Sequence, residues 1–148
     1  MGAIVRPLKT QDKAAWDELW LGYLTFYENT DLVSKVTDNT WDMISGPRED
    51  VFCLVAEVNG KVVGFVHCVL HANTWSDKPV CYLQDLFVNP SERGQGAGQA
   101  LIESINERMK TENWHRVYWR TASDNATAQA LYDKLATRTG WVTYEVNL

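Results

Sequence analysis

The sequence predicts a single mixed α/β domain over residues 1–148, in which helices flank a twisted, mostly antiparallel sheet. Two observations predict this class. Apolar residues at the 3.6-residue spacing of a helix alternate along the chain with short β-branched runs that are typical of strands. Residues 82–111 also read, in order, as a strand, a glycine-rich loop and a helix. The predicted order of elements is β-α-α-β-β-β-α-β-α-β.

The N-terminal part predicts one strand and two helices. Residues 4–8 form a short apolar strand, and Thr10 is a partial cap for the helix that follows. That helix has apolar residues at helical spacing, namely Trp16, Leu19, Trp20, Tyr23, Leu24 and Tyr27. Asn29 and Thr30 interrupt it. A second helix begins after Asp31, runs towards Ile44 and ends at residues 45–47.

The middle of the chain predicts a meander of three strands. Residues 51–58 and 61–71 are apolar runs joined by Asn59-Gly60, a two-residue hairpin turn. Residues 72–79 are predicted to form a loop that contains Trp75, and residues 80–88 form the third strand of the meander.

The C-terminal part predicts two helices that alternate with two strands. The helix after the glycine loop buries one face, made by Leu101, Ile102, Ile105 and Met109. Residues 116–121 alternate like a strand, and residues 125–139 form a helix that Gly140 terminates. Residues 141–146 are predicted to be the final strand.

Composition and charge exclude several function classes. Of 148 residues, 45% are apolar and 22% charged, as in ordinary globular domains. No apolar run is long enough for a membrane helix and the N-terminus lacks a signal pattern, so we expect a cytoplasmic protein with no membrane partner. The net charge of −5 argues against nucleic-acid binding and suits a cationic small substrate. The three cysteines lie in apolar runs without metal-ligand spacing, so we expect no metal site.

The loop from Arg93 to Gly98 has the features of an anion site. Its glycines let the backbone approach a ligand closely, and the first N–H groups of the next helix have no partner within that helix. Gly98 is followed by Gln99 and Ala100, so the loop is not a nucleotide-hydrolysing P-loop, and its glycines do not match the Rossmann spacing. A phosphate or pyrophosphate remains as the expected ligand.

Two motifs resemble the GCN5-related N-acetyltransferases (GNAT superfamily). The first is R-x-x-G-x-G, formed by Arg93, Gly96 and Gly98 after a strand that ends in LFV. The second is N-A-T-A-Q-A-L-Y on the last helix, which puts Asn125 and Tyr132 on one helix face. The strand at residues 81–88 is similar to that of the diamine, histone and D-amino-acid acetyltransferases within this superfamily.

The resemblance implies acetyl-CoA as the cofactor. The residues implied to bind it are Leu86, Phe87, Val88, Arg93, Gly94, Gln95, Gly96, Ala97, Gly98, Asn125 and Tyr132. A bulge in the strand would free backbone groups near residues 86–88 for the pantetheine arm, and Tyr132 would protonate the departing CoA thiolate.

The acceptor amine must lose a proton before it attacks, because an alkylamine has a pKa of about 10. Asp85, or a water held by Gln84, is the candidate general base. Candidates for the acceptor pocket are Tyr23, Phe26, Tyr27, Glu28 and Trp75, which combine aromatic walls with one acid. Gln84 and Asn73 stand where diamine acetyltransferases tend to carry acids, which leaves less negative charge for a dication.

The sequence therefore predicts an acetyl-CoA-dependent N-acetyltransferase whose acceptor is the primary amine of a small molecule: an amine, a polyamine or an amino acid. One alternative is transfer to a protein lysine or N-terminus. Another is a non-catalytic module that senses acyl-CoA, and a third is a nucleotide-binding module. By analogy with proteins of similar fold, we also expect a homodimer.

Overall fold

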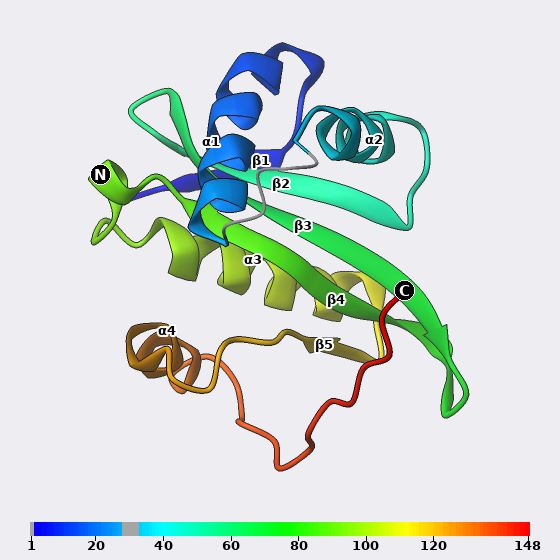
Figure 1. The fold of residues 1–148 in the computed structure, drawn as a ribbon. Helices are drawn as coiled ribbons and strands as arrows, with labels where there is room; N and C mark the ends of the chain where they lie inside the picture. The colour runs from blue at the N-terminus through cyan, green and yellow to red at the C-terminus, as the bar shows by residue number, and fades with distance from the viewer. Residues whose placement is uncertain (1, 28–32) are drawn as a thin grey trace.

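The computed structural model describes residues 2–27 and 33–148, and its centre is a five-stranded sheet in the order β1-β2-β3-β4-β5 (Figure 1). The first four strands are antiparallel, and β5 lies parallel to β4. The strands are β1 (Ile4–Pro7), β2 (Val51–Val58), β3 (Lys61–Asn73), β4 (Ser76–Val88) and β5 (Arg116–Tyr118).

Helices cover both faces of the sheet. On one face lie α1 (Lys13–Phe26) and α2 (Val33–Ser45), on the other lies α3 (Ala97–Glu112), and α4 (Ala126–Tyr132) is beside β5 (Figure 1). Two short 3-10 turns, Thr10–Asp12 and Pro90–Glu92, precede α1 and α3. None of the helices in residues 2–27 and 33–148 is both long and apolar enough to cross a membrane.

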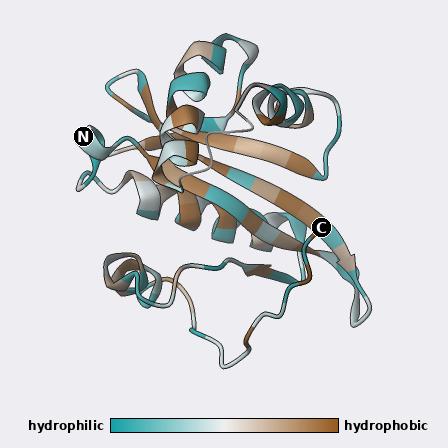
Figure 2. Ribbon diagram, viewed as in Figure 1, coloured by the Kyte–Doolittle hydropathy of each residue, from teal (hydrophilic) through white to brown (hydrophobic). Residues whose placement is uncertain are grey.

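Each face of the sheet has its own hydrophobic cluster, because successive strand residues point to opposite faces. The cluster under α1 and α2 is rich in aromatic rings and includes Trp16, Trp20, Phe65 and Phe87. The cluster under α3 is aliphatic and includes Leu101, Ile102, Ile105, Val66 and Leu83. The central strands β2 and β3 are accordingly mostly hydrophobic along their length (Figure 2).

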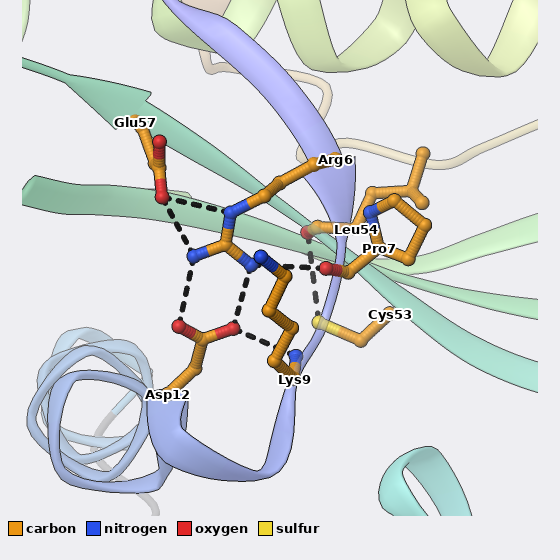
Figure 3. A network of polar contacts seen from close by, with 7 residues as sticks. All are labelled: Arg6, Pro7, Lys9, Asp12, Cys53, Leu54 and Glu57. Carbon is orange, nitrogen blue, oxygen red and sulfur yellow. Dashed lines mark hydrogen bonds and ion pairs between the residues drawn. The ribbon is translucent and has the colours of Figure 1, made fainter. Parts of the chain in front are cut away.

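An ionic network fixes the start of α1 against the sheet (Figure 3). Arg6 on β1 donates from Nη1 and Nη2 to the two carboxylate oxygens of Asp12, at 2.8 and 2.9 Å. Its Nε donates to Glu57 on β2 at 2.7 Å. Asp12 also accepts from the backbone N–H of Lys9 at 2.7 Å. These bonds join β1, β2 and the turn from which α1 begins.

The predicted mixed α/β fold is confirmed, with differences at the edges. The hairpin of β3 and β4 is longer than predicted, so most of the expected loop at residues 72–79 is strand. β5 ends at Tyr118 instead of residue 121. α1 begins at Lys13, after Asp12, instead of directly after Thr10.

Two predictions for the C-terminal part are wrong. The helix predicted over residues 125–139 ends at Tyr132, and looser turns continue to Ala136, whose N–H donates to the Tyr132 carbonyl. Thr137 and Thr139, which have low helix propensity, follow this point. The strand predicted over residues 141–146 is irregular, because a strand needs a neighbour to pair with and none lies beside it in the part of the chain that the structure describes.

Candidate functional site

The outer edge of β4 opens beyond Tyr82. Strand β5 pairs with β4 only as far as Tyr82, opposite Tyr118. On the other side of β4 the register with β3 shifts, because His67 pairs with Asp85 while Cys68 pairs with Leu83. Gln84 is therefore the extra residue of a β-bulge. The bulge and the departure of β5 together leave the edge of residues 83–88 without a neighbouring strand in the described parts of the chain.

The open edge presents the backbone groups of Leu86 and Val88. The N–H of Asn89 donates to the carbonyl of Val63 on β3 at 2.8 Å. Since antiparallel pairs alternate between bonded and non-bonded positions, Phe87 and Asp85 also pair with β3, and Leu86 and Val88 face the opposite edge. Arg93 Nε already donates to the outward carbonyl of Val88 at 3.2 Å. An amide-bearing ligand could pair with the remaining groups as an additional strand does.

The glycine loop leads from this edge into α3. Gly94 and Gly96 have φ of +85° and +81°, and an added Cβ at either would meet open space, so these positions require glycine for their backbone conformation. Gly96 caps α3, and the first helical bond runs from the N–H of Ala100 to the Gly96 carbonyl at 2.9 Å. The N–H groups of residues 97–99 have no partner within the helix, so together with Arg93 they suit the pyrophosphate of a coenzyme A molecule.

Tyr132 and Asn125 are both on α4, in different roles. The Asn125 side chain accepts from the N–H of Ala128 at 3.2 Å and caps the helix. Tyr132 packs edge-on against Trp119 with ring centroids 5.5 Å apart. Burial, with a smaller contribution from Tyr27, raises the pKa of Tyr132 above its usual value near 10. Its phenol therefore stays protonated at neutral pH, as a general acid must.

Asp85 lies on the α1 side of the sheet, next to the bulge. Its Oδ2 is 2.9 Å from Nδ1 of His67, and the two side chains are 14% and 3% exposed. Burial, followed by the negative charge of Asp85, raises the pKa of Tyr23 on α1 well above its usual value. Tyr27 packs against Tyr23 with ring centroids 4.9 Å apart, and it adds to burial in raising the pKa of both Tyr23 and Tyr132.

The structure brings together some of the predicted acceptor residues and separates others. Tyr23 lies next to both Tyr27 and Asp85: its ring centroid is 4.9 Å from that of Tyr27, and the charge of Asp85 adds to burial in raising its pKa. Phe26 lies further along α1, 58% exposed, where it lines a groove of about 470 Å³ that also contains Arg93. Trp75 is 91% exposed at the tip of the β3–β4 hairpin. Nine residues of β4 lie between Trp75 and Asp85, which corresponds to about 30 Å along the strand. Glu28 lies outside the described residues.

The remaining predicted residues lie near the open edge. Gln84 is exposed at the bulge. The Phe87 ring packs under α1, 8% exposed, with the Arg93 guanidinium 5.6 Å above it. Gln95 donates to Glu92 at 2.8 Å within the loop, and Ala97 is buried at the start of α3. A Cβ at Gly98 would be 3.8 Å from the Val88 side chain, so the loop lies directly against the end of β4.

Sequence reasoning missed His67 and Trp16 as parts of this site. Trp16 Nε1 donates to His67 Nε2 at 3.0 Å, on the side of the imidazole opposite Asp85. The one available signal was a histidine inside an apolar strand, followed in the next strand by an aspartate. The pairing of these two residues depends on the bulge at Gln84, which the sequence pattern did not locate.

Comparison with known proteins relates the chain to one family of enzymes. The profile of the acetyltransferase (GNAT) family matches residues 14–136. The chain is 32% identical to the D-amino-acid N-acetyltransferase of Saccharomyces cerevisiae over 97% of this chain and 90% of that protein. It is 31% identical to the L-2,4-diaminobutyric acid acetyltransferase of Nocardia farcinica over 59% of this chain and 44% of that one. The crystal structure of a possible acetyltransferase from Clostridium difficile 630 superposes with a TM-score of 0.85 at 17% identity, covering 100% and 99% of the two chains.

Proposed function

The chain belongs to the acetyltransferase (GNAT) family and is an N-acetyltransferase that uses acetyl-CoA, and on this basis we propose that its acceptor is the primary amine of a small molecule. The candidates are simple amines, polyamines and amino acids. The observation that carries the proposal is the Asp85 carboxylate, only 14% exposed, beside the open edge of β4. A compact ammonium group can reach such a carboxylate, and the tyrosines around it supply aromatic faces that attract cations.

The roles of the residues follow from their positions. Bound acetyl-CoA supplies the acetyl group as an activated thioester. Asp85 accepts the proton that the ammonium must lose before its nitrogen can attack. The outward N–H of Leu86 donates to the acyl oxygen as negative charge develops there. Tyr132 donates its proton to the departing sulfur; because a thiol has a pKa of about 8.5 and the pKa of Tyr132 is raised above the usual 10 of a phenol, the transfer is uphill and takes place within the hydrogen bond as charge develops on the sulfur.

A protein lysine or N-terminus is the alternative acceptor. The small-molecule acceptor is favoured by the limited exposure of Asp85 and by the similarity to enzymes whose names specify D-amino acids and diaminobutyric acid.

A coenzyme-release assay with an acceptor panel tests the proposal. The panel contains D- and L-amino acids, diamines, an aminoglycoside and lysine-bearing peptides, each at the same acetyl-CoA concentration. We expect release with at least one small amine and at least tenfold lower kcat/KM with every peptide. Release with peptides alone would replace the small-molecule acceptor by a protein, and acetyl-CoA binding without release for any acceptor would contradict catalysis.

We further propose that the protein is a homodimer, and that it is cytoplasmic. In the residues that the structure describes, β5 pairs only with β4, so its outer edge is free. The segment 141–148 has the alternating pattern of a strand but is almost fully exposed, with Trp141 at 90%, Tyr144 at 91% and Val146 at 101%. A free edge and an unpaired strand-like segment are complementary, and two copies can satisfy both by exchanging their segments.

A further inference from the structure

A hydrogen-bonded chain of three side chains runs from α1 across one face of the sheet to Asp85 on β4. The indole Nε1 of Trp16 donates to Nε2 of His67 at 3.0 Å, and Nδ1 of His67 is 2.9 Å from Oδ2 of Asp85. Trp16 is 0% exposed and His67 is 3% exposed, so both lie in the core behind Asp85. Asp85, at the end of the chain, is 14% exposed, more than either of the other two side chains.

The chain determines which protons the imidazole carries. An indole N–H can only donate, so Nε2 of His67 must offer its lone pair to Trp16. The one ring proton is therefore on Nδ1, and it is donated to Asp85. A second proton would have to occupy Nε2, where it would point at the indole N–H. Trp16 thus holds His67 in the neutral form although the imidazole contacts a carboxylate.

The neutral form matters because it sets the charge of the acceptor site. A protonated His67 beside Asp85 would make a pair with no net charge, whereas a neutral His67 leaves the full negative charge of Asp85. The titratable groups next to His67 and Asp85 add no charge to this pair. Tyr23 from α1 and Cys53 from β2, which pairs with His67, both have their pKa raised, chiefly by burial, and stay uncharged. From α2, the uncharged ring of Trp41 packs against Trp16 with ring centroids 5.3 Å apart.

We propose that Trp16 and His67 are positioning residues that keep the acceptor site anionic. Trp16 fixes the His67 tautomer, and His67 orients Asp85 by occupying one lone pair of Oδ2. The remaining lone pairs of the carboxylate then face an incoming ammonium group. This inference rests on the proposed function for its consequence in catalysis, but the tautomer itself can be observed in the free protein.

The first test is Trp16→Phe, assayed for kcat/KM of the best small amine at saturating acetyl-CoA. Without the indole N–H, a second proton on Nε2 of His67 no longer points at an opposing donor, so the site can lose its net negative charge as the pH falls. We therefore expect kcat/KM relative to wild type to be severalfold lower at pH 6 than at pH 8. Acetyl-CoA affinity should be the same at both pH values.

Trp20→Phe is the matched control. Trp20 is 5% exposed and its ring centroid is 5.2 Å from that of His67, but its Nε1 has no hydrogen-bond partner among the described residues. This variant removes the same atoms next to the imidazole without removing a hydrogen bond to it. We expect a kcat/KM ratio to wild type that does not depend on pH. An equal pH dependence in both variants, or in neither, would overturn the proposal.

The second test is 15N NMR of His67 in the wild-type protein without ligands. We expect the neutral tautomer with its proton on Nδ1 at pH 7. A proton on Nε2, or a doubly protonated ring, would overturn the proposal even if Trp16→Phe fails to fold. If the tautomer is as expected but no small amine is acetylated, the proposed acceptor class fails while the assignment of the hydrogen-bonded chain stands.

Discussion

At the scale of single residues, Tyr132 is the side chain whose chemistry can be isolated most cleanly. It is half-buried on α4 against Trp119, and its phenolic oxygen can be removed without a change of shape. We predict that Tyr132→Phe lowers kcat by about 10²-fold or less, with acetyl-CoA affinity nearly unchanged, because the proton donor is lost while the packing is kept.

The pH dependence of the Tyr132→Phe effect provides a second test with the same variant. The pKa of Tyr132 is raised, so the wild-type phenol stays protonated beyond its usual value near 10. The ratio of wild-type to variant kcat should therefore be constant from about pH 7 to 9.5. Tyr144→Phe, at a tyrosine that is 91% exposed, is the control and should match wild type. Equal turnover in wild type and Tyr132→Phe would remove Tyr132 from the mechanism.

At the scale of elements, the glycine loop before α3 depends on its backbone conformation. We predict that Gly96→Ala weakens acetyl-CoA binding about tenfold or more, because a Cβ strains a residue at φ +81° and displaces the N–H groups at the start of α3. Gly60→Ala is the matched control, since Gly60 has φ +78° in the distant β2–β3 turn. Isothermal titration with acetyl-CoA should show normal affinity for Gly60→Ala, although both variants lose stability. Equal affinities in the two variants would mean that the loop does not bind the cofactor.

The ionic network at the start of α1 should hold that helix in place. We predict that Asp12→Asn lowers the free energy of unfolding by about 2 kcal/mol at pH 7, because Arg6 and the Lys9 N–H lose a shared buried acceptor. Asp17→Asn, which removes the exposed Lys13–Asp17 pair, should cost less than about 0.5 kcal/mol. Urea unfolding of both variants measures the difference.

The same network should make the contribution of Asp12 to the free energy of unfolding depend on pH in the acid range. Arg6 lowers the pKa of Asp12 below its ordinary value of 3.8. Because the pKa of Asp12 is lower in the folded than in the unfolded protein, the ionised carboxylate stabilises the fold at pH values above its ordinary pKa. This stabilisation is lost as the pH falls through the folded-state pKa. The gap in stability between wild type and Asp12→Asn should therefore narrow below about pH 4. A gap that is the same at pH 3 and pH 7 would show that the charge of Asp12 contributes nothing.

The elements also show how far the sequence could predict the molecule. The Asn59-Gly60 turn, the glycine loop and the apolar spacing of α1 and α3 are local signals, and each produced the predicted element. The bulge at Gln84 and the contact of His67 with Asp85 depend on the register between β3 and β4, which no local pattern specifies. Residues 141–146 carry a strand pattern but have no neighbour to pair with, so their conformation depends on surroundings that the pattern does not contain.

At the scale of the whole molecule, the homodimer can be tested by light scattering coupled to size-exclusion chromatography. We predict a mass of about twice 16.9 kDa for wild type. The double variant Tyr144→Asp and Val146→Asp should be monomeric, because charges replace the apolar side chains that pairing would bury. Leu21→Asp on α1, at a residue that is 49% exposed, is the control and should remain dimeric. A monomeric wild type would contradict the proposal.

The central claim for the whole molecule is that an amine is bound and deprotonated at Asp85 beside the open edge of β4. Asp85→Asn tests it most directly, because an amide keeps the shape and the hydrogen bond from His67 but can neither carry the charge nor take the proton. Asp77→Asn, at an exposed hairpin residue, changes the net charge equally and is the control. We predict that Asp85→Asn lowers kcat/KM for the amine by about 10²-fold or more, with unchanged acetyl-CoA affinity, while Asp77→Asn matches wild type. A decrease in kcat/KM of less than about twofold for Asp85→Asn would contradict the account, because the loss of a general base should lower kcat/KM far more.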